Sequence, residues 1–143
     1  MSAPFVIIQK IAGMMNVQPV AACPIKRRQT VTKKISVYLA SAYTKGDVAQ
    51  NINKAICIAD ILAEGGFAPY IPTLTHFWHL VSPHPWEFWI DYDAELLPMF
   101  DCVLRIPGES VGADREVMQA IELGIPVFYT ISDLREAYNG SSA

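Results

Sequence analysis

Short apolar runs alternate with longer amphipathic segments along most of the chain. Runs over residues 35–40, 68–74, 102–106 and 127–131 are bounded by polar residues, glycine or proline, as is typical of strands. Two prolines inside the second run favour an edge position or a short span for that strand. Because helical patterns separate the runs, the alternation predicts right-handed strand–helix–strand units around a parallel sheet.

Three segments between these runs have a helical pattern. Apolar residues repeat at helical spacing over 48–63, and Asp47 with Gln50 is placed as a capping box at its start. Residues 86–100 predict an aromatic-rich helix, and residues 113–121 repeat the helical spacing. Breakers that mark the helix ends stand at Gly65, Gly66, Gly124 and Pro126.

The junction over residues 107–116 carries the most specific pattern. A proline–glycine turn connects a predicted strand to a predicted helix, and Glu116 lies one turn inside that helix. Helical side chains lean toward the N-terminus, so Glu116 is expected to point to the helix opening, where backbone N–H groups attract anions. Parallel sheets bind ligands beyond the carboxyl ends of their strands. Ser41, Thr73 and Ser110 all fall at such positions.

Length and composition fit one enzyme-sized domain. The 143 residues are 52% hydrophobic, which is enough for a buried parallel sheet. A net charge of −3 provides no general attraction to nucleic acid. No apolar run approaches the roughly 18 residues that a membrane span requires. Cys23, Cys57 and Cys102 lack metal-ligand spacing, so we expect small buried hydrophobic residues in a reducing, cytoplasmic compartment.

The two ends of the chain differ from its middle. Residues 1–33 contain lysine and arginine but no acidic residue. This composition leaves open a transit-type segment or one that binds an anionic surface, and it favours a poorly ordered basic extension. Residues 139–143 are small and polar, as in a solvated, flexible tail. The predicted domain therefore covers residues 34–138.

Upstream side chains extend the pattern of the junction. Asp93 lies on the aromatic-rich helix, Asp101 opens the next strand, and residues 110–116 read Ser-x-Gly-x-x-x-Glu. With Tyr38 near the end of the first strand, this order resembles the nucleoside 2-deoxyribosyltransferase family over roughly residues 34–130. The resemblance and the alternating runs predict a flavodoxin- or Rossmann-like three-layer α/β sandwich with a mainly parallel sheet of four or five strands.

The resemblance assigns catalytic roles to three side chains. Glu116 is expected to attack C1′ of the sugar, which suits a carboxylate because the transition state is positive there. Asp93 is expected to protonate the departing base, with Asp91 as the alternative because the helix register is not fixed. Tyr38 is expected to contact the nucleophile through its hydroxyl. The structural alternatives are a first-turn glutamate at the helix dipole, a solvated aspartate and a buried strand tyrosine.

Ser110 separates two branches of the resembled family. Members that act on free nucleosides carry an acid at this position, whereas hydrolases of nucleoside 5′-monophosphates carry serine. A hydroxyl and turn amides donate to a phosphate that a carboxylate would repel. Ser41 and Gly112 are further expected substrate contacts, and Lys45 is either an added charge or a solvated lysine. Asp101 is assigned to substrate binding, with a structural role in orienting its neighbours as the alternative.

The segment between residues 73 and 89 is rich in aromatic residues, unlike the better-known family members. Trp89 and its aromatic neighbours are expected to form a wall for a flat base or a subunit contact, and a satellite core is the alternative. His76, His79 and His84 are loosely spaced with no cysteine or carboxylate to complete a set, so no metal is expected. The resemblance also implies a homodimer or a larger even homo-oligomer.

The sequence therefore predicts an enzyme that works without a cofactor. Its expected reaction is cleavage of the N-glycosidic bond of a ribo- or deoxyribonucleoside 5′-monophosphate through Glu116 and a glycosyl-enzyme intermediate. The alternatives are base exchange between 2′-deoxynucleosides and a nucleotide-sensing module of the same fold without turnover. The expected partner is a small nucleotide or nucleoside. Binding to nucleic acid or to a membrane is not expected.

Overall fold

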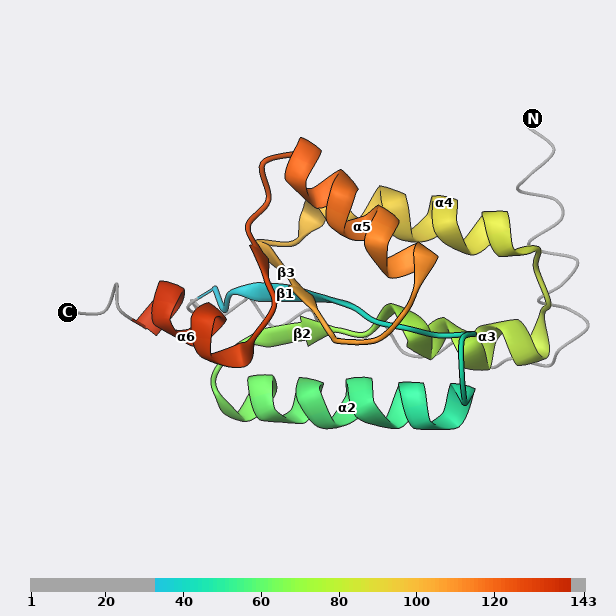
Figure 1. Cartoon of the computed structure of the whole chain (residues 1–143), viewed down its shortest axis with the longest axis horizontal. Helices are drawn as coiled ribbons and strands as arrows, with labels where there is room; N and C mark the ends of the chain where they lie inside the picture. Colours follow the sequence, from blue (N-terminus) through green and yellow to red (C-terminus); the bar gives the residue numbers. More distant parts are fainter. Residues whose placement is uncertain (1–32, 140–143) are drawn as a thin grey trace, which may run out of the picture. The chain divides into compact units, whose positions relative to one another are not determined.

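The computed structural model describes residues 33–139, which contain one parallel sheet and the helices that cover it (Figure 1). The strands are β1 (Ser36–Ala40), β2 (Ala68–Tyr70), β3 (Cys102–Arg105) and β4 (Val127–Phe128). The α-helices are α2 (Val48–Glu64), α3 (Thr75–Val81), α4 (Trp86–Leu96), α5 (Val111–Glu122) and α6 (Ile131–Asn139), and the 3-10 helices are η1 (Pro72–Leu74) and η2 (Leu97–Met99). The predictions for Cys23, for the basic extension up to residue 32 and for residues 140–143 lie outside the described residues.

The strands lie in the order β2-β1-β3-β4, and all neighbouring pairs are parallel. Tyr38 of β1 pairs with Tyr70 on one side and with Val103 on the other. The strand order reverses between β1 and β3, as in flavodoxin-type sheets, which bind ligands in the crevice beyond this point. The edge position of β2 confirms the prediction made from its prolines.

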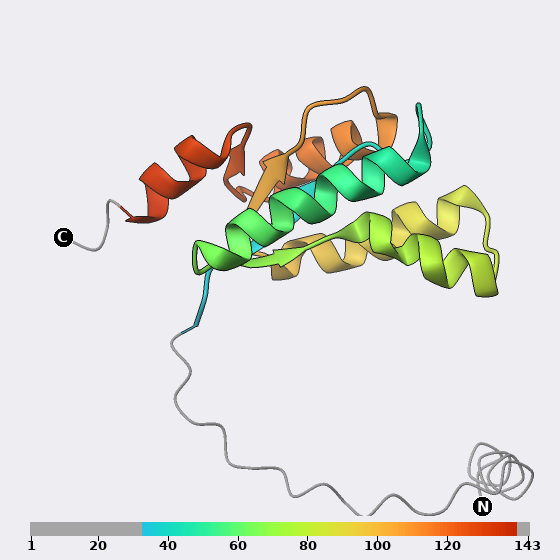
Figure 2. The ribbon, with the colours of Figure 1, turned by 90° about the horizontal axis from the view of Figure 1, so that it is seen from below.

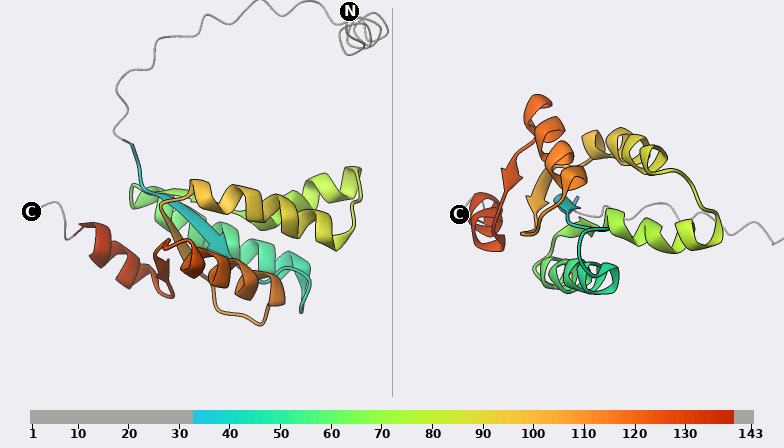
Figure 3. Two further views of the ribbon diagram at one scale, coloured as in Figure 1. Left: turned by 90° about the horizontal axis from the view of Figure 1, so that it is seen from above. Right: turned by 45° about the vertical axis from the view of Figure 1, so that its right-hand side comes forward.

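Successive residues of β1 face opposite sides of the sheet, as the pleat requires. Val37 and Leu39 belong to a core completed by residues of α2 and α6, whereas Tyr38 and Ala40 belong to a second core with residues of α5 and η2. Figure 2 shows α2 in front of the sheet, and the left view of Figure 3 shows α4 and α5 on the opposite side. The predicted three-layer α/β sandwich is confirmed.

The second and fourth strands are shorter than predicted. β2 ends at Tyr70, because Pro72 begins the 3-10 turn η1, a position that requires no backbone donor. β4 spans two residues, and the remaining apolar run leads into α6, where Thr130 accepts a hydrogen bond from the backbone N–H of Asp133 at 3.1 Å. An apolar run alone does not distinguish a strand end from a helix start.

The helices agree with the predictions except in three places. Asp47 caps α2 as predicted and accepts a hydrogen bond from the backbone N–H of Gln50 at 2.8 Å. The predicted helix over 86–100 is divided into α4 and the 3-10 turn η2. α3 and α6 were not predicted from the sequence. None of the helices within residues 33–139 is both long and apolar enough to cross a membrane.

The cysteine prediction is correct for one of the two described cysteines. Cys102 is fully buried in the core beside α2 and α6. Cys57 is exposed on α2, which corrects the expectation that it is a small buried residue. The core side of α2 is formed instead by Ala55 and Ala59, which lie on the face toward the sheet.

Candidate functional site

A cavity of about 310 Å³ lies beyond the carboxyl ends of the strands. Its lining comes from four segments that are far apart in the sequence: the loop after β1, the region of η1 and α3, the helix α4, and the turn that leads into α5. Six of the predicted site residues line it, namely Ser41, Trp89, Asp93, Ser110, Gly112 and Glu116. The parallel topology therefore brings most of the predicted site together at one edge of the sheet.

Glu116 is placed by the start of α5. Ser110 is the N-cap, and its hydroxyl oxygen accepts a hydrogen bond from the backbone N–H of Ala113 at 3.2 Å. The preceding Gly108 has φ of +151°, a conformation that glycine adopts without a steric penalty. Glu116 then projects into the cavity, where the hydroxyl of the fully buried Tyr38 donates to Glu116 Oε1 at 2.9 Å.

The surroundings of Glu116 favour its protonated form. The pKa of Glu116 is raised to about 8, mainly by burial and in part by the nearby Asp93 charge. The Tyr38 hydrogen bond and the positive charge of Arg105 oppose this shift. The phenol is affected in the same direction, because burial and the two carboxylates raise the pKa of Tyr38 well above its usual range. Tyr38 is therefore a hydrogen-bond donor to Glu116 and not a base.

Asp93 faces the same cavity from α4. Its side chain is buried, and burial raises its pKa to about 6. Trp86, Trp89, Ile90 and Asp93 line the cavity at helical spacing, which fixes the register of the helix. Asp91 lies outside this stripe and is exposed, so of the two aspartates only Asp93 is placed at the cavity.

Three buried side-chain oxygens within the described part of the chain have no hydrogen-bond partner. They are Ser41 Oγ, Thr73 Oγ1 and Asp93 Oδ1, and all three residues line the cavity. Buried polar groups are nearly always paired in folded proteins, so unpaired ones that share a cavity indicate a polar ligand or water. Thr73 was recognised in the sequence only by its position after a strand.

Arg105 supports the turn that carries Ser110, and sequence reasoning missed this role. The guanidinium is almost fully buried; it donates to Asp114 Oδ1 at 2.8 Å and to the carbonyl oxygen of Gly108 at 2.7 Å. Lys54 of α2 donates to the carbonyl oxygen of Pro107 at 2.7 Å. The turn is thus held from both sides. A charged residue inside an otherwise apolar predicted strand was the available signal.

Lys45 forms an ion pair with Glu109 at the rim of the cavity. Both side chains are largely exposed, so the pair is screened by solvent. Lys45 is the only lysine or arginine that lines the cavity within the described residues. Among these residues, no group of three His, Cys, Asp or Glu side chains is arranged to hold a metal ion.

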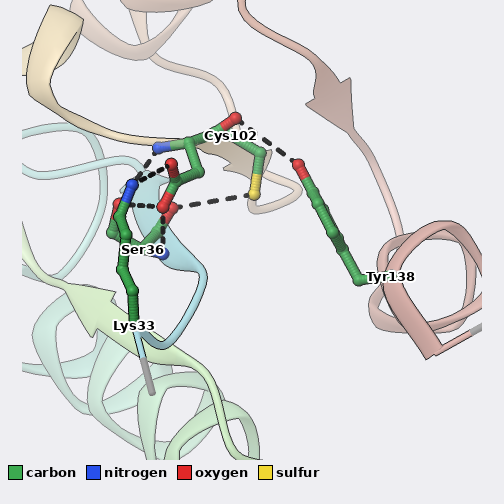
Figure 4. Close-up of polar contacts among 5 residues, drawn as sticks. Lys33, Ser36, Cys102 and Tyr138 are labelled. Carbon is green, nitrogen blue, oxygen red and sulfur yellow. Dashed lines mark hydrogen bonds and ion pairs between the residues drawn. The ribbon is translucent and has the colours of Figure 1, made fainter. Parts of the chain in front are cut away.

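Asp101 is a correction to the predicted site, because the structure does not bring it to the cavity. It precedes β3 and therefore lies at the amino ends of the strands, where Figure 4 shows Lys33, Ser36 and Cys102 close together. Its carboxylate accepts hydrogen bonds at 2.8 Å from Lys33 Nζ, from the backbone N–H of Ser36 and from Ser36 Oγ. The hydrogen bonds from Lys33 and Ser36 lower the pKa of Asp101 to about 2. This geometry favours the structural alternative, in which Asp101 joins β1 to β3.

Replacing Asp101 by Ala is expected to destabilise the fold without changing the cavity. The two Ser36 donors lose their acceptor, which costs about 1–3 kcal/mol. Because the folded state lowers this pKa, the stabilisation is present above the unfolded value near pH 4 and is lost as the pH falls toward 2. Urea unfolding of the wild type and of D101A at pH 7 and pH 3 measures the difference in their stability. A stable D101A protein that no longer binds substrate would restore the substrate-binding role.

The parallel sheet and the helices that cover it can be compared with known proteins. No protein-family model matches this sequence, and a search of curated proteins found no match. A search of solved structures found the 2-deoxyribosyltransferase of the psychrotolerant bacterium Bacillus psychrosaccharolyticus. The two chains share 20% identity with a TM-score of 0.50, over 64% of this chain and 69% of that chain. This likeness confirms the predicted fold.

Proposed function

We propose that this chain is an enzyme that cleaves the N-glycosidic bond of a nucleoside or a nucleoside 5′-monophosphate. The observation that carries the proposal is the half-buried Glu116, held by the Tyr38 hydroxyl in the same cavity as the buried Asp93. Two carboxyl groups with raised pKa values in one cavity are typical of acid–base and covalent chemistry at a glycosidic bond. The fold shared with a 2-deoxyribosyltransferase supports the same reaction class.

The proposed first step forms a bond between Glu116 and the sugar. Tyr38 occupies Oε1 of Glu116, so the other carboxylate oxygen attacks C1′. The bond between C1′ and the base nitrogen breaks, and its electron pair leaves with the base. Asp93 donates the proton that the base requires. The products of this step are a neutral base, a glycosyl ester on Glu116 and an ionised Asp93.

The second step releases the sugar from Glu116. Water, or a second base, attacks C1′ from the side that the first base has left. Asp93 accepts the proton of the attacking molecule, and Glu116 leaves as a carboxylate. Hydrolysis and base exchange differ only in the attacking molecule. Residues that admit or exclude water would therefore decide between the two reactions.

The polar lining supports a sugar-containing ligand. Ser41 and Thr73 present unpaired hydroxyls at the ends of the neighbouring strands β1 and β2, and Asp93 presents an unpaired carboxyl oxygen. Hydroxyls of a sugar supply both donors and acceptors to such groups. The indole rings of Trp86 and Trp89 supply an apolar wall to the same cavity. A ligand with one polar and one flat aromatic part fits this division.

The group at the 5′-position distinguishes two related functions. Ser110 at the start of α5 supports a monophosphate, since its hydroxyl hydrogen and the first-turn backbone N–H groups are donors. The ion pair of Lys45 with Glu109 favours the second candidate, a free nucleoside that exchanges its base, because a phosphate would have to compete for this lysine. We propose the hydrolase on monophosphates as the first candidate.

Base release measured by chromatography tests the proposal. The four common 2′-deoxynucleosides, their 5′-monophosphates and the ribose equivalents are each incubated with the protein, with and without an acceptor base. Free base without acceptor supports hydrolysis, and a new nucleoside that forms only with acceptor supports exchange. Binding of these ligands without any release of base would instead support the nucleotide-sensing module.

Replacing Ser110 by Asp is expected to move the preference from the monophosphate to the free nucleoside. Both residues cap helices, so α5 keeps its start while a negative charge appears beside the 5′-position. Hydrogen bonds to charged groups are typically worth about 1.5–3 kcal/mol, or roughly ten- to a hundredfold in relative kcat/KM. Steady-state kinetics of both proteins with both substrates measure the ratio of kcat/KM for the monophosphate to kcat/KM for the free nucleoside.

Ser110→Asn is the matched control for this substitution. Asparagine also caps helices and has the shape of aspartate without its charge, so the substrate ratio should change little. An equal change in both variants would show that the turn was disturbed. A wild-type protein that already prefers free nucleosides would place base exchange ahead of hydrolysis.

The homodimer predicted from the sequence is kept as part of the proposal. α3 exposes apolar side chains on its outer surface, with exposed fractions of 60% for Phe77, 64% for Leu80 and 88% for Val81. Neighbouring apolar side chains of this size on one short helix are typical of an interaction surface. A second copy of the chain placed there would remove this surface from water.

A further inference from the structure

The hydrogen bonding of His79 fixes which of its ring nitrogens carries the proton. His79 lies on α3 and lines the cavity. Trp89 Nε1 donates to His79 Nδ1 at 3.0 Å, and the backbone N–H of His84 approaches the same nitrogen at 3.4 Å. An indole N–H and a backbone N–H can only donate, so Nδ1 must be the acceptor. The neutral imidazole therefore carries its proton on Nε2.

The other cavity histidine lacks this constraint. His76 Nδ1 shares a hydrogen bond of 2.6 Å with the hydroxyl of Tyr43. A hydroxyl can donate or accept, so either tautomer of His76 satisfies this contact. His79 is thus the lining histidine that offers a donor of fixed direction to a ligand. Within the described residues, its Nε2 makes no hydrogen bond to the protein.

The position of Asp93 indicates where a base would lie. If Asp93 protonates the base, the base must lie against α4, on which Asp93 is found. Ile90, Trp89 and Trp86 continue the cavity wall along this helix for about two turns, roughly 10 Å at 1.5 Å per residue. A purine or pyrimidine ring is shorter than this wall. Its edge away from the sugar would then lie beside His79, which Trp89 contacts directly.

We infer that His79 is a specificity-determining residue that donates from Nε2 to a carbonyl oxygen on the far edge of the base. This inference rests on the proposed function, because it uses Asp93 to place the base. A carbonyl accepts this hydrogen bond, whereas an exocyclic amino group presents a second donor to it. The preferred substrates would therefore carry a 6-oxopurine or a 4-oxopyrimidine, and Trp89 would act by holding the histidine tautomer.

Binding of free bases tests the inference independently of catalysis. Hypoxanthine and adenine differ at the 6-position, where one carries an oxygen and the other an amino group. Long-range ¹⁵N NMR of the histidine rings reports the tautomer of His79 and its response to each base. Hypoxanthine is expected to bind about ten- to a hundredfold more tightly than adenine and to shift the His79 Nε2 signal.

Two variants and one control complete the experiment. His79→Gln should reduce the preference to within about threefold, because a side-chain amide can turn either its donor or its acceptor to the ligand. Trp89→Phe keeps the aromatic wall but removes the indole donor, so it should release the tautomer and weaken the preference. Glu87→Gln changes an exposed side chain of α4 that does not line the cavity and should leave the preference unchanged.

The outcomes separate this inference from the proposed function. A proton on Nδ1 of His79, absence of binding by either base, or an unchanged preference in His79→Gln would each overturn the inference. Base release that proceeds with no discrimination between oxo and amino bases would also overturn it, while leaving the glycosidic reaction in place. A shift of the His79 signal by hypoxanthine in a protein without turnover would support the inference and contradict the enzyme.

Discussion

Replacing Glu116 by Gln is expected to abolish base release and, at alkaline pH, to stabilise the fold. The amide keeps the shape of the carboxyl group and can still accept the Tyr38 hydrogen bond, but it cannot form the ester with C1′. Removal of a nucleophile typically costs several orders of magnitude in rate, so we expect a loss of more than about a thousandfold in kcat. Ligand binding should largely survive.

The effect of this substitution on stability depends on pH. The folded state raises the pKa of Glu116 to about 8, so the group favours folding while it is protonated and opposes folding once it must ionise. Each unit of raised pKa corresponds to about 1.4 kcal/mol. The free energy of unfolding of E116Q should therefore match that of the wild type near pH 5 and exceed it by roughly 2–4 kcal/mol at pH 9.

Urea unfolding at pH 5 and pH 9 measures the change, and Glu122→Gln on the same helix is the control. Glu122 is exposed and does not line the cavity, so this variant should show neither effect. A constant stability difference between E116Q and the wild type would contradict the burial of the charge. Near-normal base release by E116Q would show that Glu116 is only a charge at the start of α5.

Asp93→Asn is expected to affect substrates according to their need for a proton. An ordinary purine leaves poorly without protonation, so loss of a positioned acid should slow its release about 10²–10⁴-fold. An N7-methylated purine already carries a positive charge and leaves as a neutral base, so its release should change by less than about tenfold. Single-turnover rates with the matched pair of nucleosides measure the difference.

The same pair of carboxyl groups sets the expected pH profile. The reaction needs Glu116 ionised, a fraction that rises up to a pH of about 8, and Asp93 protonated, a fraction that falls above about 6. The product of the two fractions rises to about pH 6, is nearly constant to about pH 8 and then falls. In Asp93→Asn the falling limb should disappear, because the group that must stay protonated is gone.

Asp91→Asn is the control for Asp93, since it changes an exposed aspartate on the same helix. It should leave both the rates and the profile as in the wild type. If the rate loss depends on the leaving group in D91N rather than in D93N, the acid has been assigned to the wrong residue. If both nucleosides slow equally in D93N, Asp93 positions the substrate and does not supply the proton.

The sheet and its site edge could be predicted from the sequence because each depends on a local pattern. Apolar runs, glycine turns and the position of Ser110 indicate strands, helix starts and the carboxyl ends where ligands bind. The length of β2 and the start of α6 could not be predicted, because an apolar run has no period that distinguishes a strand from a buried turn. Pro72 at the start of η1 and the hydrogen bond from Asp133 to Thr130 decided these cases.

Residues of the candidate site could be predicted where their place follows from their position along the chain. They could not be predicted where their place depends on contacts with other side chains. Glu116 and Asp93 stand at positions that their spacing identifies, and the structure brings them to one cavity. Asp101 has the same residue type but opens its strand, so its place at the amino end already follows from the sequence, whereas ligands bind at the carboxyl ends. Arg105 and His79 contact side chains about ten positions along the chain, Asp114 and Trp89, which no periodic pattern of the sequence pairs with them.

The cap of α5 has a consequence for how this site can evolve. Ser110 starts the helix and also lines the cavity, so any replacement must satisfy the backbone before it can alter ligand choice. Serine, asparagine and aspartate all satisfy that requirement. From a serine codon of the AGC type, single-nucleotide changes lead to asparagine and then to aspartate. A lineage could therefore exchange a hydroxyl for a charge at the ligand while every intermediate keeps its helix.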